Sequence, residues 1–214
     1  MDAIEYVDKT WNPYTGCKHI ETGQCAVGKD CWAYNMARRL AGRYGYDKKR
    51  PFKPTFHLDR LDEPMRRKKP TRYAACFMGD IACASTEDVE LILDIVRRTP
   101  RHTYYFLTKN PAPLMEITEW PKNAWLGVTV NEKKDMWRIH QLRKIDVKHW
   151  VSFEPLKEDL GMDVPYYHIE FIVIGAQTGA HPFQPEHRWV YKIVELARID
   201  KIPVCLKENL RRGK

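Results

Sequence analysis

The chain has 214 residues, of which 43% are hydrophobic and 12% aromatic, so it can form one domain with a sizeable core and is short for two. Apolar residues recur from end to end, which excludes a disordered or low-complexity chain. It lacks an apolar run of the roughly 18 residues that a membrane span needs, and its first residues lack the basic and apolar start of an export signal. We therefore expect a soluble, cytoplasmic protein with no membrane partner.

The positive charge is concentrated in one segment. The chain has 36 Lys and Arg against 28 Asp and Glu, and 14 and 5 of these fall between Lys29 and Arg72. Tyr and Phe residues are interleaved with the basic ones there, which is typical of a surface that binds a polyanion. A solvated face that only maintains solubility is the alternative. We interpret residues 38–72 as a basic insertion in a single domain that spans residues 1–214.

Short apolar runs, polar turns and segments of helical periodicity alternate along the chain. In chain order, we expect a strand that ends near 17, a helix at 31–44, a strand at 73–77, a helix at 86–98, strands at 103–107 and 124–130 on either side of a segment at 112–117, a helix at 132–144, strands at 149–153 and 171–174, a helix at 186–199 and a last strand at 203–207. Ser85 carries the cap signal of the helix at 86–98. About seven β/α cycles predict a parallel sheet with crossover helices, either a partial or complete TIM-like barrel or an open doubly wound sheet.

The six cysteines of a chain without an export signal favour metal or redox chemistry over disulfides. Cys17, Cys25 and Cys31 lie close together, whereas the other three are scattered. Three thiolates on one loop suit a [4Fe-4S] cluster with one iron open to a substrate or cofactor. Zinc, with His19 or a distant cysteine as fourth ligand, is an alternative, and so are unligated thiols. We interpret Cys76 and Cys205 as small buried hydrophobes and Cys83 as a passive thiol, with a hydrogen donor as the alternative for Cys83.

Polar residues follow each predicted strand, where parallel α/β folds carry function. They are Met78, Gly79 and Asp80, then Thr108 and Lys109, Thr129 and Asn131, Glu154, Gln177, and Lys207 to Asn209. All of them should point to one mouth, onto which the three-cysteine loop also opens. Taken singly, each has a simpler interpretation, such as a helix cap for Asp80, a turn for Thr108 or a surface acid for Glu154.

A family resemblance rests on motifs spread over nearly the whole chain. These are WNPYTGC (11–17), CWAY (31–34), HLDRLDEP (57–64), LTKNP (107–111), WLGVTV (125–130), SFEPL (152–156) and VIGAQTG (173–179). In this order they resemble the phage and prokaryotic Gp37/Gp68 family (DUF5131), a radical S-adenosylmethionine (SAM) type of protein. Two features differ from the family's usual pattern: five residues instead of two separate Cys25 from Cys31, and Trp32 replaces a Tyr.

The resemblance implies a radical SAM β/α barrel, a [4Fe-4S] cluster on Cys17, Cys25 and Cys31, and SAM as cofactor or cosubstrate. In such a protein, the SAM amino group meets the loop after the second strand, and its carboxylate and ribose meet the next loops. The cofactor contacts that we assign on this basis are Trp32 and Tyr34 against adenine, Met78, Gly79 and Asp80 at the amino group, Thr108 and Lys109 at the carboxylate, Thr129 and Asn131 at the ribose, and Glu154 and Gln177 at ribose or substrate.

The activity implied is reductive cleavage of SAM to a 5′-deoxyadenosyl radical that abstracts hydrogen from the substrate. The reductant would be a protein such as flavodoxin or ferredoxin. The basic segment suggests an anionic substrate, for example a nucleotide or a nucleic-acid base, which must leave a duplex to reach a buried radical. A zinc-stabilised nucleic-acid-binding module without catalysis is the alternative function.

Overall fold

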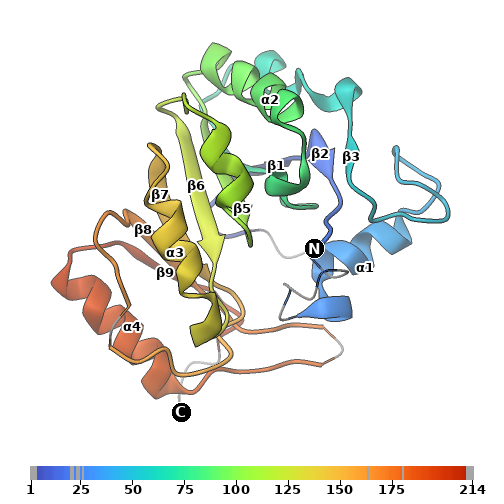
Figure 1. Cartoon of the computed structure of the whole chain (residues 1–214). Coiled ribbons are helices and arrows are strands. Elements are labelled where there is room, and N and C mark those ends of the chain that lie inside the picture. Colours follow the sequence, from blue (N-terminus) through green and yellow to red (C-terminus); the bar gives the residue numbers. More distant parts are fainter. Residues whose placement is uncertain are drawn as a thin grey trace.

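The protein is built around one parallel sheet. The computed structural model describes residues 4–19, 22, 25, 27–162, 164–179 and 181–210. Each strand of this sheet pairs with the next in chain order. The strands are β1 (Lys9–Trp11), β4 (Arg72–Ala75), β5 (Thr103–Thr108), β6 (Ala124–Thr129), β7 (Lys148–Phe153), β8 (Phe171–Ile174) and β9 (Val204–Leu206). The predicted α/β fold is confirmed, and it is the partial form of the TIM-like barrel: the curled sheet is a half-barrel with β1 and β9 as its edges (Figure 1).

Side chains of the strands alternate between two apolar clusters. In β5, Tyr104 and Phe106 are fully buried in the core that the sheet shares with its helices. The residues between and beyond them, Tyr105 and Leu107, belong to a second, aromatic cluster around Trp150. This period of two is what an extended strand with both faces covered requires.

Three helices cover the outer face of the sheet: α2 (Thr86–Arg98), α3 (Trp137–Leu142) and α4 (His187–Ile199) (Figure 1). The predicted cap of α2 is confirmed, because Ser85 Oγ accepts a hydrogen bond from the Asp88 N–H at 3.1 Å. Ile92 and Leu93 on the inner side of α2 are 0% exposed. None of the described helices has the length and apolar character needed to cross a membrane.

The N-terminal segment fills the concave side of the half-barrel. Tyr6 is 7% exposed, and its ring lies 5.5 to 5.9 Å from the rings of Tyr105, Trp150 and Phe171. Glu5 Oε1 accepts the N–H of Glu208, which follows β9. Tyr6, together with Ile4 and Val7, therefore belongs to the aromatic cluster around Trp150.

Helix α1 (Trp32–Arg39) ends earlier than the predicted helix, which continued to residue 44. Gly42, Tyr44 and Gly45 have positive φ angles of 74°, 51° and 76°, and such residues do not continue a right-handed helix. The loop beyond them returns through the small antiparallel sheet of β2 (Tyr14–Thr15) and β3 (Thr55–Phe56).

The predicted charged helix at 132–144 is also shorter than expected. A 3₁₀ turn, η6 (Lys133–Asp135), precedes α3 because the buried Asp135 carboxylate accepts the N–H groups of Asn131 and Glu132 and pairs with Arg138 at 2.8 Å. The segment at 112–117 is another 3₁₀ helix, η5 (Ala112–Glu116). The remaining 3₁₀ helices of the described chain are η1 (Gly28–Asp30), η2 (Leu58–Arg60), η3 (Glu63–Arg66) and η4 (Ile81–Cys83).

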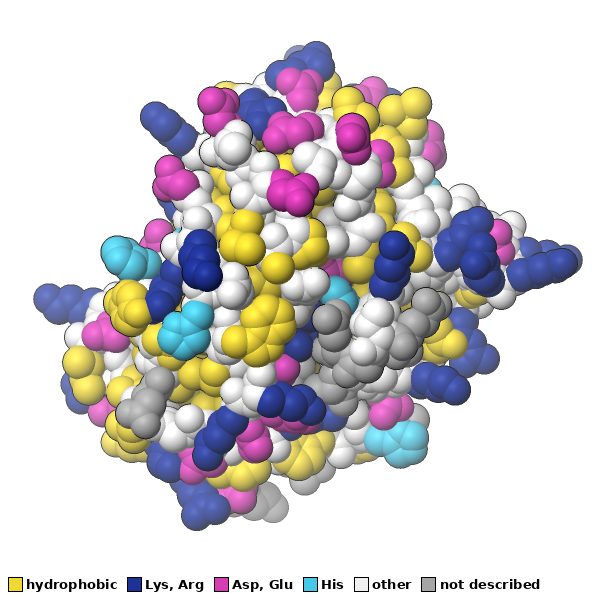
Figure 2. Space-filling view, in the orientation of Figure 1, with side chains coloured by type: hydrophobic (Ala, Val, Ile, Leu, Met, Phe, Trp, Pro, Cys, Tyr) yellow, Lys and Arg dark blue, Asp and Glu magenta, His cyan; other side chains and the backbone are white. Residues whose placement is uncertain are grey.

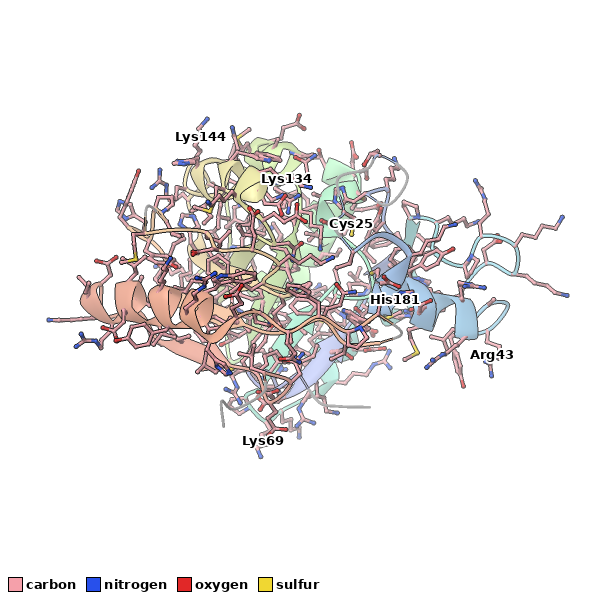
Figure 3. The ribbon with its side chains drawn as sticks, turned by 90° about the horizontal axis from the view of Figure 1, so that it is seen from below. Cys25, Arg43, Lys69, Lys134, Lys144 and His181 are labelled. Atoms are coloured by element: carbon pink, nitrogen blue, oxygen red, sulfur yellow. The ribbon has the colours of Figure 1, made fainter. Side chains whose placement is uncertain are left out.

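The basic segment divides between two places. Arg38 and Arg39 lie on α1 and Arg43 in the loop after it, whereas the run from Arg66 to Lys69 precedes β4. The carbonyl of Arg67 accepts from His102, just before β5, so this second run lies at the amino ends of the strands. Arg43 and Lys69 are correspondingly far apart in Figure 3. Residues 66–69 therefore lie at the end of the sheet opposite to the carboxyl ends of the strands.

Candidate functional site

A pocket lies at the carboxyl ends of β4, β5 and β6. It has a volume of about 100 Å³, smaller than a typical pocket for a drug-sized ligand. Its lining includes all three cysteines of the predicted cluster and several of the predicted cofactor contacts. The lining residues are Cys17, His19, Cys25, Cys31, Trp32, Ala33, Phe52, Phe77, Gly79, Asp80, Leu107, Thr108, Lys109 and Thr129.

Two glycines hold the first cysteine in place. Gly16 donates its N–H to the Met78 carbonyl at 3.0 Å and accepts the Asp80 N–H at 3.1 Å, so the first loop lies directly on the loop after β4. A Cβ on Gly16 would lie 2.2 Å from the Lys53 oxygen, and one on Gly79 would lie 2.4 Å from the Gly16 oxygen. This close backbone approach places Cys17 at the pocket.

Cys31 occupies the N-cap position of α1. Burial raises the pKa of its thiol, while the charge of Lys109 and the backbone N–H groups of Tyr34 and Ala33 oppose that rise. A helix N-terminus and a lysine favour a thiolate over a thiol. Burial outweighs these contacts, so the net effect is a raised pKa and the metal-free protein keeps Cys31 as a thiol.

Cys83, which we expected to be a passive thiol, lies beside Cys17. The ligand atoms of Cys17, His19 and Cys83 all lie within 4.8 Å of one another. The His19 N–H donates to Cys17 Sγ at 3.3 Å and the Lys18 N–H to Cys83 Sγ at 3.5 Å. A hydrogen bond from Cys17 and another from His19 lower the pKa of Cys83, so Cys83 ionises before Cys17.

Asp80 organises the loops around the pocket. Its carboxylate is 4% exposed and accepts hydrogen bonds from His19 Nε2 at 2.7 Å, the Lys109 N–H at 2.8 Å and the Ala82 N–H at 3.0 Å. Burial raises its pKa, but these bonds and one from Thr108 outweigh burial and hold the pKa below its usual value. Burial lowers the pKa of His19, yet the bonds to Asp80 and Cys83 raise it to about 10.

Asp80 is thus a helix cap, the simpler interpretation of this residue, because it caps η4 through Ala82. It also connects the loop after β4 to the loop after β5. Thr108 is 1% exposed, and its hydroxyl also accepts the Asn110 N–H at 3.0 Å. Asp80 and Thr108 use their polar atoms in these contacts. Of the predicted cofactor contacts, the side chain of Lys109 and the half-exposed ring of Trp32 are therefore best able to reach a ligand.

Five predicted cofactor contacts do not line the pocket. The Tyr34 ring packs edge-on against Phe52 and lies under the Arg38 guanidinium. Met78 is buried, and its carbonyl already accepts the Gly16 N–H. Asn131 is 0% exposed and donates from Nδ2 to the Pro155 carbonyl at 2.7 Å.

Glu154 and Gln177, the other two, follow β7 and β8 but serve neighbouring loops. Glu154 accepts from Ser152 Oγ at 3.1 Å and lies 3.5 Å from Lys207 Nζ; burial raises its pKa. Gln177 donates to the His181 carbonyl at 2.7 Å, and His181 Nδ1 lies 3.0 Å from Asp30 Oδ1 of the cysteine loop. Gln177 therefore shapes a hairpin that contacts η1.

The apolar lining of the pocket was not predicted from the sequence. Phe77 and Leu107 form part of its wall, and the Phe77 ring stacks on Trp150 of the concave cluster at 6.3 Å between centroids. Phe77 directly precedes the polar residues after β4, and Leu107 begins the LTKNP motif. These positions were the signal in the sequence that both residues could line the pocket. The sequence predicted His19 only as an alternative zinc ligand, and it did not predict that Cys83 lies beside Cys17.

Two solved structures of spore photoproduct lyase are similar to this chain. One, described as complexed with dinucleoside spore photoproduct, has a TM-score of 0.62, and a cysteine-to-serine mutant has 0.61. In both, the identity is 10%, and the match covers 97% of this chain and 79% of the other. The likeness shows the fold, a curled parallel half-barrel.

No curated protein matches the chain. A family model described as a protein of unknown function (DUF5131) matches residues 1–209, nearly the full length of the chain. The chain therefore belongs to the DUF5131 family.

Proposed function

We propose that the protein is a radical SAM enzyme that acts on an anionic substrate of the nucleotide or nucleic-acid class. One observation carries the proposal: Cys17, Cys25 and Cys31 line a single pocket at the carboxyl ends of the strands of a half-barrel. Spore photoproduct lyase, whose fold this chain shares, is a radical SAM enzyme. The fold likeness and the thiols support the same chemistry independently.

The donor set fits a [4Fe-4S] cluster. Three thiols from one loop supply three ligands, which leaves one iron for a cofactor. The same pocket contains a lysine, polar strand ends and apolar walls, the mixture typical of a site that binds an amphiphilic small molecule. Bound together, such a cluster and SAM supply a 5′-deoxyadenosyl radical that can abstract a hydrogen atom from an unreactive carbon.

The chain's own residues then have three tasks. Lys109 pairs with the SAM carboxylate, because Asp80 fixes its backbone and the residue lines the pocket. Trp32, 52% exposed at the mouth, offers a ring face to adenine. Phe77 and Leu107 exclude water from one wall of the pocket, which protects a reactive intermediate.

The substrate class is proposed from charge. Helix α1 starts at the pocket with Trp32 and continues to Arg39, about 10 Å farther along its axis at the usual rise of a helix. Figure 2 shows Lys and Arg side chains gathered over α1 and the loop after it. A polyanion held along this surface would bring one of its residues to the mouth.

The first test is anaerobic purification and cluster reconstitution. We expect a brown protein with about four irons and four sulfides per chain, which forms 5′-deoxyadenosine when dithionite and SAM are added. Cys25→Ser should abolish both the colour and the product, whereas Cys205→Ser, outside the pocket lining, should retain both. A colourless protein that contains zinc and binds nucleic acid would contradict the proposal and support the zinc-stabilised binding module.

A further inference from the structure

A second set of metal ligands overlaps the proposed cluster site. It consists of Cys17 and His19 from the first loop and Cys83 from the end of η4. The three ligand atoms lie within 4.8 Å of one another, although 64 residues separate His19 from Cys83. Neither the family resemblance nor the fold likeness assigns a role to Cys83.

The arrangement is held rigidly from both sides. The contact of Gly16 with the loop at 78–80 fixes the two chain segments against each other. The His19 ring is 4% exposed, and its Nε2 faces both Asp80 Oδ2 at 2.7 Å and Cys83 Sγ at 4.0 Å. The ring nitrogen and the two sulfurs therefore converge without a change in the fold.

The spacing of these atoms suits one ion better than a cluster. Thiolates of a [4Fe-4S] cluster bind different irons and are spread around the cluster, whereas ligands of one tetrahedral ion share a single coordination sphere. Two sulfurs and one imidazole nitrogen are ligands typical of zinc and related divalent cations. Asp80 Oδ2, next to His19 Nε2, or a water molecule would complete four-coordination.

We propose that Cys17, His19 and Cys83 form a site for a single divalent cation of the zinc class, which competes with the cluster for Cys17. The cation stabilises the first loop in protein that lacks the cluster, and cluster assembly must displace it. The competition rests on the proposed function, because it requires Cys17 to be a cluster ligand. The cation site itself rests only on the three side chains.

Cobalt(II) is the probe for this site, because its tetrahedral thiolate complexes absorb in the visible and near-ultraviolet range. Metal-free, reduced protein is titrated anaerobically with cobalt(II). We expect one equivalent to bind, with thiolate-to-cobalt absorption, and Cys83→Ser and His19→Gln each to weaken binding at least tenfold. Cys25→Ser is the matched control, since it removes a thiol of the same pocket but should bind cobalt(II) like the native chain. Circular dichroism identifies any variant that fails to fold, and the His19 and Cys83 variants test the site independently.

Iron–sulfur reconstitution separates the two proposals. Cys83→Ser should assemble as much cluster as the native chain, whereas Cys25→Ser should assemble none. Zinc loaded beforehand should slow assembly in the native chain and have little effect in Cys83→Ser. Unchanged cobalt binding in Cys83→Ser, or an equal loss in Cys25→Ser, would overturn the cation site. Assembly unaffected by zinc would overturn the competition, and cobalt binding in a native chain that never forms a cluster would refute the proposed function alone.

Discussion

The Asp80 carboxylate accepts the backbone N–H of Lys109 at 2.8 Å, and this bond joins the loop after β4 to the loop after β5. The same carboxylate binds His19 of the cysteine loop. One buried acid thus sets the positions of the lysine that we expect to bind SAM and of the loop that carries the cysteines. Three segments of the pocket depend on a single side chain.

Asp80→Asn should destabilise the metal-free protein. Asn keeps the shape but replaces an anionic acceptor by a neutral amide among groups that all donate, so we expect the free energy of unfolding to fall by about 2–4 kcal/mol. Urea unfolding measures the change. Asp62→Asn removes an exposed ion pair with Arg66 and should cost less than about 1 kcal/mol. Equal losses in the two variants would show that Asp80 does not organise the loops.

Lys109→Gln should weaken SAM binding without loss of the cluster. Removing one charge-assisted contact of about 1.5–3 kcal/mol corresponds to roughly 10- to 150-fold in the dissociation constant. Calorimetric titration of the reconstituted protein with SAM measures this, and iron content reports on the cluster. Lys144→Gln, an exposed lysine, is the control. Unchanged SAM affinity in Lys109→Gln would remove the assigned contact.

The two parts of the basic segment should differ in nucleic-acid binding. Replacing Arg38, Arg39 and Arg43 together by Gln should lower the affinity for single-stranded DNA and reduce its salt dependence, by about 0.7 in slope for each phosphate that is no longer neutralised. The matched variant replaces Arg66, Lys68 and Lys69, which precede β4 at the opposite end of the strands, and should have little effect. Fluorescence anisotropy at several salt concentrations distinguishes them. Equal effects would indicate diffuse attraction by net charge.

His57 should make the stability depend on pH. Burial and the nearby charge of Arg60 lower its pKa to about 4, and the neutral ring lies 2.8 Å from Thr15 Oγ1. Because the unfolded chain takes up this proton near pH 6.5, the stabilisation is complete above that pH and is lost as the pH falls towards 4, by at most about 3 kcal/mol. Urea unfolding at several pH values between about 4.5 and about 7 measures how the free energy of unfolding changes with pH.

His57→Gln should flatten this pH profile, because Gln has no proton to gain in the range. The exposed His187, at the start of α4, gives the control: His187→Gln should retain the slope of the native chain. Parallel profiles for the native chain and His57→Gln would assign the pH dependence to other groups.

The positions of the strands along the chain could be predicted because most are apolar runs that end at a polar turn. Phe171–Ile174 and Thr103–Thr108 are recognisable from local sequence alone. The end of α1 at Arg39 was missed, although Gly42, with its positive φ, follows three residues later. The late start of the helix predicted at 132–144 depends on the buried Asp135–Arg138 pair, which forms only in the packed structure.

The location of the site could be predicted from the sequence, but the set of residues that line it could not. Asp80 and Lys109 follow strands and do reach the pocket, yet Glu154 follows a strand too and contacts Lys207 instead. A position directly after a strand places a residue at the carboxyl edge of the sheet. The curl of the sheet then determines which of these side chains lie close together. The approach of Cys83 to Cys17 depends on two glycines that allow the backbones to touch, and no local pattern encodes that contact.

The ring of Tyr6 within the half-barrel limits how a long polymer could bind to the protein. Tyr6 and its neighbours pack against the aromatic cluster on the concave side, whereas the cysteines line a pocket at the carboxyl ends of the strands. Under the proposed function, a strand of nucleic acid would lie across the rim of this pocket and turn one nucleotide inward. Each binding event would then bring a single nucleotide to the pocket, and the strand would not slide through the protein.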